Sequence, residues 1–270
     1  MSTSTSALRA PGWLAALLAA IAIVATGCGR PDPVERLQAA QQKMLDAGSA
    51  AFTIEQSFEG EPVSGQKIVI DGVLSFADRL GRATITMADG RAEALFIGDA
   101  TYFRLPLGPQ PTPWIRLDRQ DIESFSGLSG ISDDPSRNLD LLDGIVGDVE
   151  EVGEEDVRGE PTTHYRFTID LQQAVEKAPP DKRETVRQQA ALLGGGQLPM
   201  EVWLDGKGRI ARQTFAIDLS KVKLPTGGAL PEGLDVTTRT AIEYHDFGAK
   251  VDVKPPPDNQ VTDFDQLQGG

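Results

Sequence analysis

Cysteine and histidine are nearly missing from this chain. Cys28 is the only cysteine among 270 residues, and His164 and His245 are the only histidines. A single cysteine excludes an internal disulfide framework. A zinc site, or a nucleophile paired with a base, needs more such side chains, and no GxSxG motif is present. We therefore predict that the protein is not an enzyme and has no metal site and no cofactor.

Long apolar segments are also missing. The longest uncharged apolar run, Trp13–Ala25, is 13 residues long, whereas a membrane-spanning helix needs about 20. The run follows Arg9, the only charged side chain among the first 27 residues. A short apolar run behind a basic residue is typical of an export signal. We predict a lipoprotein signal peptide over residues 1–27.

The signal ends in Ala25-Thr-Gly-Cys28, which resembles a bacterial lipobox, although Ala25 stands where that motif more often has leucine. The resemblance implies that Cys28 is the lipid attachment site and carries a palmitate-type acyl anchor. Residues 28–33 then form a short tether, and the protein is held on the extracytoplasmic face of the cell membrane. The alternatives are a secretory signal cut after Ala22 and a buried free thiol.

Positive charge is in short supply. Lys and Arg number 26 against 40 Asp and Glu, a net charge of −14, which becomes −15 when the +1 of Arg9 leaves with the signal. Such a surface repels nucleic acid and anionic headgroups. We predict no nucleic-acid partner, and membrane contact only through the lipid anchor.

Three segments have helical patterns. Asp32-Pro33 is typical of a helix start, and Gly48 ends that run. A second helix is predicted from Asp134 to Gly144. The third insert covers residues 172–193 and includes a predicted capping box at 181–184.

Most of the remaining chain alternates apolar and polar residues with a period of two, which predicts half-buried antiparallel strands. These runs lie at residues 52–58, 68–70, 83–87, 94–96, 103–105, 114–117, 146–152, 162–171, 200–204, 215–219 and 236–244. We predict an α+β fold, a strongly curved antiparallel half-barrel of about 10–11 strands with helices covering its concave face. The domain spans residues 34–250, and a Pro-rich C-terminal tail follows at 251–270.

Two local motifs carry a resemblance to a known family. They are a strand entry of the form GxxTxHY at 159–165 and a hairpin of the form PxxVWxDxxGR at 199–209. Together with the order of strands and helices over roughly 34–250, they resemble actinobacterial LppX/LprG-type lipoproteins with the LolA-like fold. The resemblance implies an apolar cavity and a role in carrying lipids, glycolipids or acyl chains across the cell envelope.

The inward positions of the predicted strands and helices give the candidate lining of this ligand cavity. The same side chains would equally fill a packed core, and only the resemblance favours a cavity. The lining residues are Ile68, Ile70, Ile85, Met87, Phe96, Phe103, Leu139, Leu142, Phe167, Ile169, Val186, Leu193, Phe215, Ile217 and Tyr244.

Several other features have a functional and a structural interpretation. His164 and His245 could contact a ligand headgroup, although exposed or edge-bonded strand histidines are the simpler interpretation. The acidic residues 148–156 could bind calcium, but they lack the ligand spacing of a known calcium-binding loop. A solvated turn is therefore the favoured interpretation. Trp203 is out of phase with its strand's apolar face, which favours a structural role at a helix contact or on the convex face.

Two functional hypotheses follow. In the first, a non-enzymatic, membrane-anchored lipoprotein binds lipid or acyl chains in an apolar cavity and carries or presents them in the cell envelope. In the second, the half-barrel is a solid scaffold or sensor that acts through a protein partner, whose identity the sequence does not give, without lipid cargo.

Overall fold

The computed structural model describes residues 32–105, 112–117, 142, 144–222, 235–264 and 266. The compact unit begins at Asp32. No helix within the described ranges is both long enough and apolar enough to cross a membrane. The predicted signal peptide and Cys28 lie outside these ranges, as does the helix predicted from Asp134, apart from Leu142 and Gly144.

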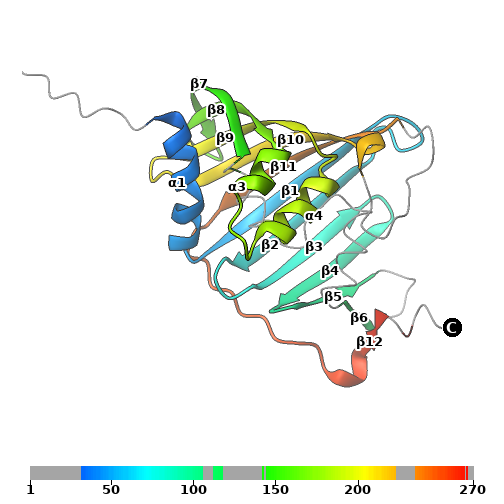
Figure 1. The fold of residues 1–270 in the computed structure, drawn as a ribbon. Helices are drawn as coiled ribbons and strands as arrows, with labels where there is room; N and C mark the ends of the chain where they lie inside the picture. The colour runs from blue at the N-terminus through cyan, green and yellow to red at the C-terminus, as the bar shows by residue number, and fades with distance from the viewer. Residues whose placement is uncertain are drawn as a thin grey trace, which may run out of the picture. The chain divides into compact units, whose positions relative to one another are not determined.

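The described residues form an α+β fold around one open sheet of twelve strands (Figure 1). The strand order is β12-β6-β5-β4-β3-β2-β1-β11-β10-β9-β8-β7. Every neighbouring pair is antiparallel except β12 and β6, which are parallel. The antiparallel sheet inferred from the period of two is therefore confirmed.

The strand bounds follow the predicted runs closely and extend most of them by a few residues. They are β1 Ser49–Glu59, β2 Lys67–Ser75, β3 Leu80–Met87, β4 Gly90–Ile97, β5 Ala100–Arg104, β6 Trp114–Leu117, β7 Ile145–Val157, β8 Glu160–Asp170, β9 Gln197–Asp205, β10 Ile210–Asp218, β11 Thr237–His245 and β12 Val261–Asp263.

The α-helices lie on one side of the sheet (Figure 1). They are α1 Pro33–Asp46, α3 Leu171–Lys177 and α4 Arg183–Leu192, and short 3₁₀ turns occupy Leu219–Lys221 and Asp258–Gln260. The predicted start of the first helix is confirmed, because the Asp32 side chain accepts a hydrogen bond from the Val34 amide at 2.8 Å.

The insert at 172–193 forms two helices rather than one continuous element. Asp170 caps α3 by accepting hydrogen bonds from the amides of Gln172 and Gln173, both at 3.0 Å. The predicted capping box at 181–184 is wrong, because Lys182 is the N-cap of α4 and makes no side-chain cap bond. Asp181 lies one position too early to reach the free amides of the first turn.

One hydrophobic core joins the helices to one face of the sheet, which we call the inner face. Leu37 and Met44 of α1, Leu171 of α3 and Val186 of α4 belong to the same buried cluster as Phe52 of β1. Gly72 of β2 makes room for this packing, since a Cβ atom built there would lie 2.6 Å from Phe52 Cζ. The helices therefore cover the inner face by direct side-chain packing.

Two segments differ from the sequence-based expectation. The acidic residues 148–156, interpreted as a turn, belong to strand β7. This strand lies at the end of the sheet, where exposed glutamate side chains hinder pairing with another chain. Its pairing with β8 is irregular, with register shifts next to Gly153.

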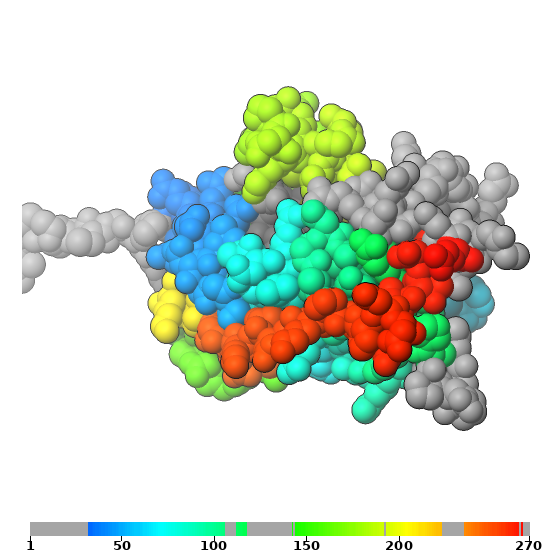
Figure 2. All heavy atoms as spheres, turned by 90° about the horizontal axis from the view of Figure 1, so that it is seen from below, coloured from blue at the N-terminus to red at the C-terminus, as the bar shows by residue number. Residues whose placement is uncertain are grey.

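The second difference is at the C-terminus. Strand β12 pairs with β6 and gives the sheet one strand more than the 10–11 predicted, so the sheet extends into the segment assigned to the tail. Figure 2 shows the orange-to-red segment after β11 running along the surface toward β12. The Ser49 hydroxyl fixes its start by donating to the Ala249 carbonyl at 2.7 Å.

Candidate functional site

The inner face of the sheet brings the predicted lining residues together. Most are fully buried in the main core, namely Ile70, Leu142, Phe167, Ile169, Val186, Phe215, Ile217 and Tyr244. Others are partly buried and pack against that core, namely Ile68, Ile85, Phe96, Phe103 and Leu193. Met87 is half-buried at the end of β3, and Leu139 lies outside the described residues.

The inner face is not buried uniformly. On β8 to β11, apolar inward side chains such as Ile169, Ile217 and Tyr244 are fully buried. On β2 to β5, the larger inward side chains such as Ile85 and Phe103 keep part of their surface accessible. The accessible apolar surface of the inner face therefore lies on the β2–β5 half of the sheet.

A group of neutral polar side chains interrupts this apolar face, and sequence reasoning missed it. Gln56 of β1, Gln213 of β10, and Thr238 and Thr240 of β11 are at most 6% exposed. Thr240 lies directly opposite Gln56 on one side and Phe215 on the other. The sequence pattern could have revealed this polar group, because all four residues are in phase with the buried apolar positions of their strands.

Three residues of this polar group, Gln213, Thr238 and Thr240, each have a side-chain atom without a hydrogen-bond partner among the described residues. These atoms are Nε2 of Gln213, Oγ1 of Thr238 and Oγ1 of Thr240. Buried polar atoms are almost always satisfied in folded proteins. The inner face therefore contains three neutral groups that can each form a further hydrogen bond.

The outer face of the sheet holds a second cluster, built around His164. The imidazole is 4% exposed, stacks on Trp203, and places Nδ1 3.0 Å from Glu155 and Nε2 3.4 Å from Glu201. The interpretation of His164 as an exposed histidine is therefore wrong, whereas its contact with Glu155 does join it to the end strand β7. Strand β8 lies between β7 and β9, and side chains from both neighbours enclose the ring.

Trp203 ties this cluster to strand β7. Its indole N–H donates to Glu155 Oε2 at 2.8 Å, and the ring packs with Val157 and Ala211 in a small cluster separate from the main core. The hydrogen bond from Trp203, followed by that from His164, holds the pKa of the Glu155 carboxyl below its usual value. Trp203 therefore has the structural outer-face role that its sequence phase predicted.

His245 lies away from this cluster, at the end of β11. Its Nδ1 is 2.9 Å from Asp246, and the ring is only half-buried. Within the described residues, no group of three or more His, Cys, Asp or Glu side chains could hold a metal ion. The two histidines therefore do not share a site.

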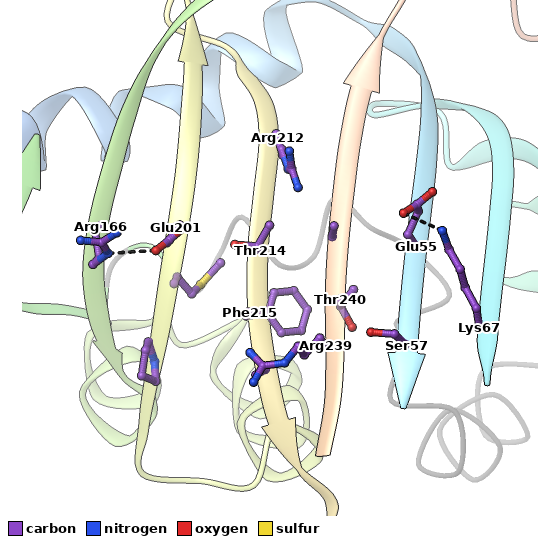
Figure 3. A pocket seen from close by; sticks show the side chains of 14 residues that line it. Glu55, Ser57, Lys67, Arg166, Glu201, Arg212, Thr214, Phe215, Arg239 and Thr240 are labelled. Atoms are coloured by element: carbon purple, nitrogen blue, oxygen red, sulfur yellow. Dashed lines mark hydrogen bonds and ion pairs between the residues drawn. The ribbon is translucent and has the colours of Figure 1, made fainter. Parts of the chain in front are cut away.

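A groove of about 560 Å³ crosses the outer face over strands β8, β9, β10, β11, β1 and β2 (Figure 3). Ion pairs lie along its sides, including Arg166–Glu201 at 2.9 Å and Lys67–Glu55 at 3.0 Å. Arg239 also lines the groove, and its guanidinium contacts Glu59 at 2.6 Å. The groove is therefore lined by charged side chains together with apolar ones such as Ala216 and Ala241.

Comparison with known proteins identifies one curated relative of similar length. The chain is 27% identical over 270 residues to an uncharacterized 31.2 kDa protein in the rplA–rplJ intergenic region of Streptomyces griseus, and the match covers 89% of this chain and 83% of that protein. No protein-family model matches the chain.

Solved structures with a similar fold include LprF from Mycobacterium bovis, at a TM-score of 0.47 and 14% identity over 83% of this chain and 96% of that one. The lipoprotein LppX from Mycobacterium tuberculosis has a TM-score of 0.42 and 16% identity over 81% and 99% of the two chains. A LolA superfamily protein from Nitrosomonas europaea has a TM-score of 0.30 and 10% identity over 82% and 96%. The solved structures to which this chain is similar thus include a mycobacterial lipoprotein and a LolA superfamily protein.

Proposed function

We propose that this chain is a non-enzymatic lipoprotein that binds lipid or acyl chains between the inner face of its sheet and its helices. The sheet would curve as a half-barrel with the inner face concave. The cargo would be carried or presented at the extracytoplasmic face of the cell membrane. The observation that supports the proposal most directly is the accessible apolar surface on the β2–β5 half of the inner face.

The driving force would be burial of the cargo's methylene groups, about 0.8 kcal/mol for each. Half-buried side chains such as Phe96 and Phe103 already line an apolar surface next to the core, so a chain placed there gains contacts without unfolding the core. A lipid fits this surface better than a sugar or a nucleotide, because the apolar positions offer those ligands no hydrogen bonds.

We further propose that Cys28 carries the anchor. Only a few residues separate Cys28 from the start of α1 at Pro33, and an extended chain gains about 3.5 Å per residue. A tether this short would keep the body close to the membrane from which cargo is taken.

The experiment uses residues 29–270, which contain the whole compact unit that begins at Asp32. The protein is purified without detergent, extracted with organic solvent, and the extract is analysed by mass spectrometry. We expect a stoichiometric lipid in the extract, and displacement of a bound fluorescent fatty acid by added lipid. An empty extract together with no fluorescent fatty-acid binding would contradict lipid carriage.

The outer groove supports a second candidate function, a scaffold or sensor that acts through a protein partner. Matched ion pairs along a groove are typical of polar protein–protein surfaces. Crosslinking in cells distinguishes the two, because a specific protein partner with no copurifying lipid supports the scaffold.

A further inference from the structure

We propose that Gln213, Thr238 and Thr240 form a hydrogen-bonding subsite for an uncharged oxygen atom in the buried part of a lipid. This inference rests on the proposed function, since it assumes that a lipid occupies the inner face. It adds a chemical selection that apolar burial alone does not provide. The cargo class is a lipid with an ester, keto or hydroxyl oxygen along its buried chain.

Strand pairing places these side chains at one location on the inner face. Thr240 is opposite Phe215, and Gln213 is opposite Ile242, so Gln213 is a diagonal neighbour of Thr240. Thr238 lies two residues from Thr240 on the same face of β11. Directly opposite and diagonal side chains on one face lie within reach of a common ligand group.

The subsite also adjoins the accessible apolar surface. Gln56 is opposite Thr240 on one side and opposite Ile68 of β2 on the other. Ile68 is half-buried, whereas Thr240 is 6% exposed. A chain lying on the β2–β5 half would therefore reach the polar group at the boundary with the fully buried half.

The unpartnered atoms determine which chemistry fits. Nε2 of Gln213 can only donate, and a threonine hydroxyl can donate or accept. An acceptor oxygen on the cargo has two lone pairs and could accept from two neighbouring groups, such as Thr240 with Gln213 or Thr240 with Thr238. A plain hydrocarbon would leave them without partners, which costs free energy in a buried environment.

The same surroundings exclude a charged group. The inward residues of β1, β10 and β11 near the subsite carry no charge, namely Phe52, Ile54, Gln56, Gln213, Phe215, Ile217, Thr238, Thr240, Ile242 and Tyr244. A buried carboxylate or phosphate needs a cation beside it. The subsite therefore selects neutral oxygen over an ionised headgroup.

The test uses the protein of residues 29–270. It compares how well three probes of similar chain length displace a bound fluorescent fatty acid. The probes are methyl stearate, nonadecane and, at pH 8, stearate. We expect methyl stearate to compete about tenfold better than nonadecane, the range that one net hydrogen bond supplies. We expect stearate to compete less well than its methyl ester.

The variant Thr238→Val/Thr240→Val removes two hydroxyls and keeps the side-chain shape. We expect it to lose the preference for the ester and to bind nonadecane at least as well as the unchanged protein does. The control is Thr214→Val, because Thr214 is half-buried and lines the outer groove. The control should keep the preference of the unchanged protein.

Thermal unfolding of the lipid-free protein provides a readout that does not depend on binding. Removing unpartnered buried hydroxyls should raise the melting temperature of the double variant. A lower melting temperature would show that the hydroxyls already have partners and would overturn the subsite. Equal competition by methyl stearate and nonadecane would also overturn it, while lipid binding would stand. If no probe competes, the proposed function itself fails.

Discussion

His164 lies flat against Trp203, with ring centroids 4.1 Å apart and an angle of 10° between the ring planes. Both side chains reach the same carboxylate, because His164 Nδ1 is 3.0 Å from Glu155 Oε1 and the Trp203 indole donates to Oε2 at 2.8 Å. Glu155 belongs to β7, the end strand of the sheet, and Trp203 to β9. The stacked pair therefore links the end strand β7 to β9 across the intervening strand β8.

This arrangement predicts a pH dependence of stability to which Glu155 contributes. Its pKa in the folded protein lies below the usual 4.5, first through the Trp203 hydrogen bond and then through His164. The stabilisation is therefore fully present above about pH 4.5, the unfolded value, and is lost as the pH falls through the lower folded value. We expect Glu155→Gln to lose less of its unfolding free energy than the unchanged protein between pH 6 and pH 3.

Urea unfolding at a series of pH values measures this effect. The control is Glu154→Gln, because Glu154 neighbours Glu155 on β7 and is exposed as Glu155 is, but its side chain points to the opposite face of the strand, away from Trp203 and His164. The control should follow the pH profile of the unchanged protein. Parallel profiles for Glu155→Gln and the unchanged protein would contradict the role assigned to the Trp203 and His164 contacts.

A second prediction concerns the close packing at Gly72. A Cβ atom there would lie 2.5 Å from the Arg82 carbonyl oxygen as well as against Phe52, so backbone and core would both have to move. We expect Gly72→Ala to lower the unfolding free energy by about 1–3 kcal/mol.

Chemical denaturation checks this value against Gly206→Ala in the β9–β10 hairpin, where an added Cβ would meet nothing within 4 Å. The hairpin variant should change stability by less than about 0.5 kcal/mol. Equal effects of the two substitutions would show that the contact with Phe52 does not limit the packing.

A third prediction tests the inner face as the lipid surface. Phe96 and Leu95 are adjacent, half-buried residues of β4, and Phe96 packs against the main core. Since successive side chains of a strand point to opposite faces, Leu95 faces outward. We expect Phe96→Gln to weaken fluorescent fatty-acid binding about tenfold or more, the effect of losing one large apolar contact.

Titration of both variants with the same fatty acid provides the comparison. Leu95→Gln should bind within about twofold of the unchanged protein, because it removes apolar surface from the other face. Weaker binding by Leu95→Gln than by Phe96→Gln would place the lipid on the outer face instead.

A fourth prediction concerns the anchor. We expect full-length Cys28→Ser to lose incorporation of radiolabelled palmitate and to leave the membrane fraction. Since the chain has no other cysteine, no second thiol can replace Cys28. Persistent labelling or membrane retention of the variant would indicate attachment by another route, and cell fractionation with acyl labelling distinguishes these outcomes.

Local patterns made much of the fold predictable. The Asp32-Pro33 start specifies α1 because a side-chain cap and a proline satisfy the first turn without help from the rest of the chain. Strands such as β10 follow from alternation, since burying one face of a sheet imposes a period of two on any sequence. The inward lining positions follow from the same rule.

Features that depend on distant partners were not predictable. The burial of His164 requires Glu155 and Trp203, and nothing within the GxxTxHY motif indicates which strands will lie beside it. The pairing of β12 with β6 joins segments more than 100 residues apart through three residues without a strand pattern.

The sequence by itself determined the first helix and the alternation that gives the sheet one apolar face, because each depends on neighbouring residues, and the export signal and lipid motif stay predictions of the same local kind. Only the tertiary structure decided that Gln213 and Thr240 lie together on that face beside Gln56, and that the acidic segment forms the end strand. The physical reason is that strand register aligns residues far apart in the chain. Which polar atoms are buried without partners is therefore a property of the assembled sheet.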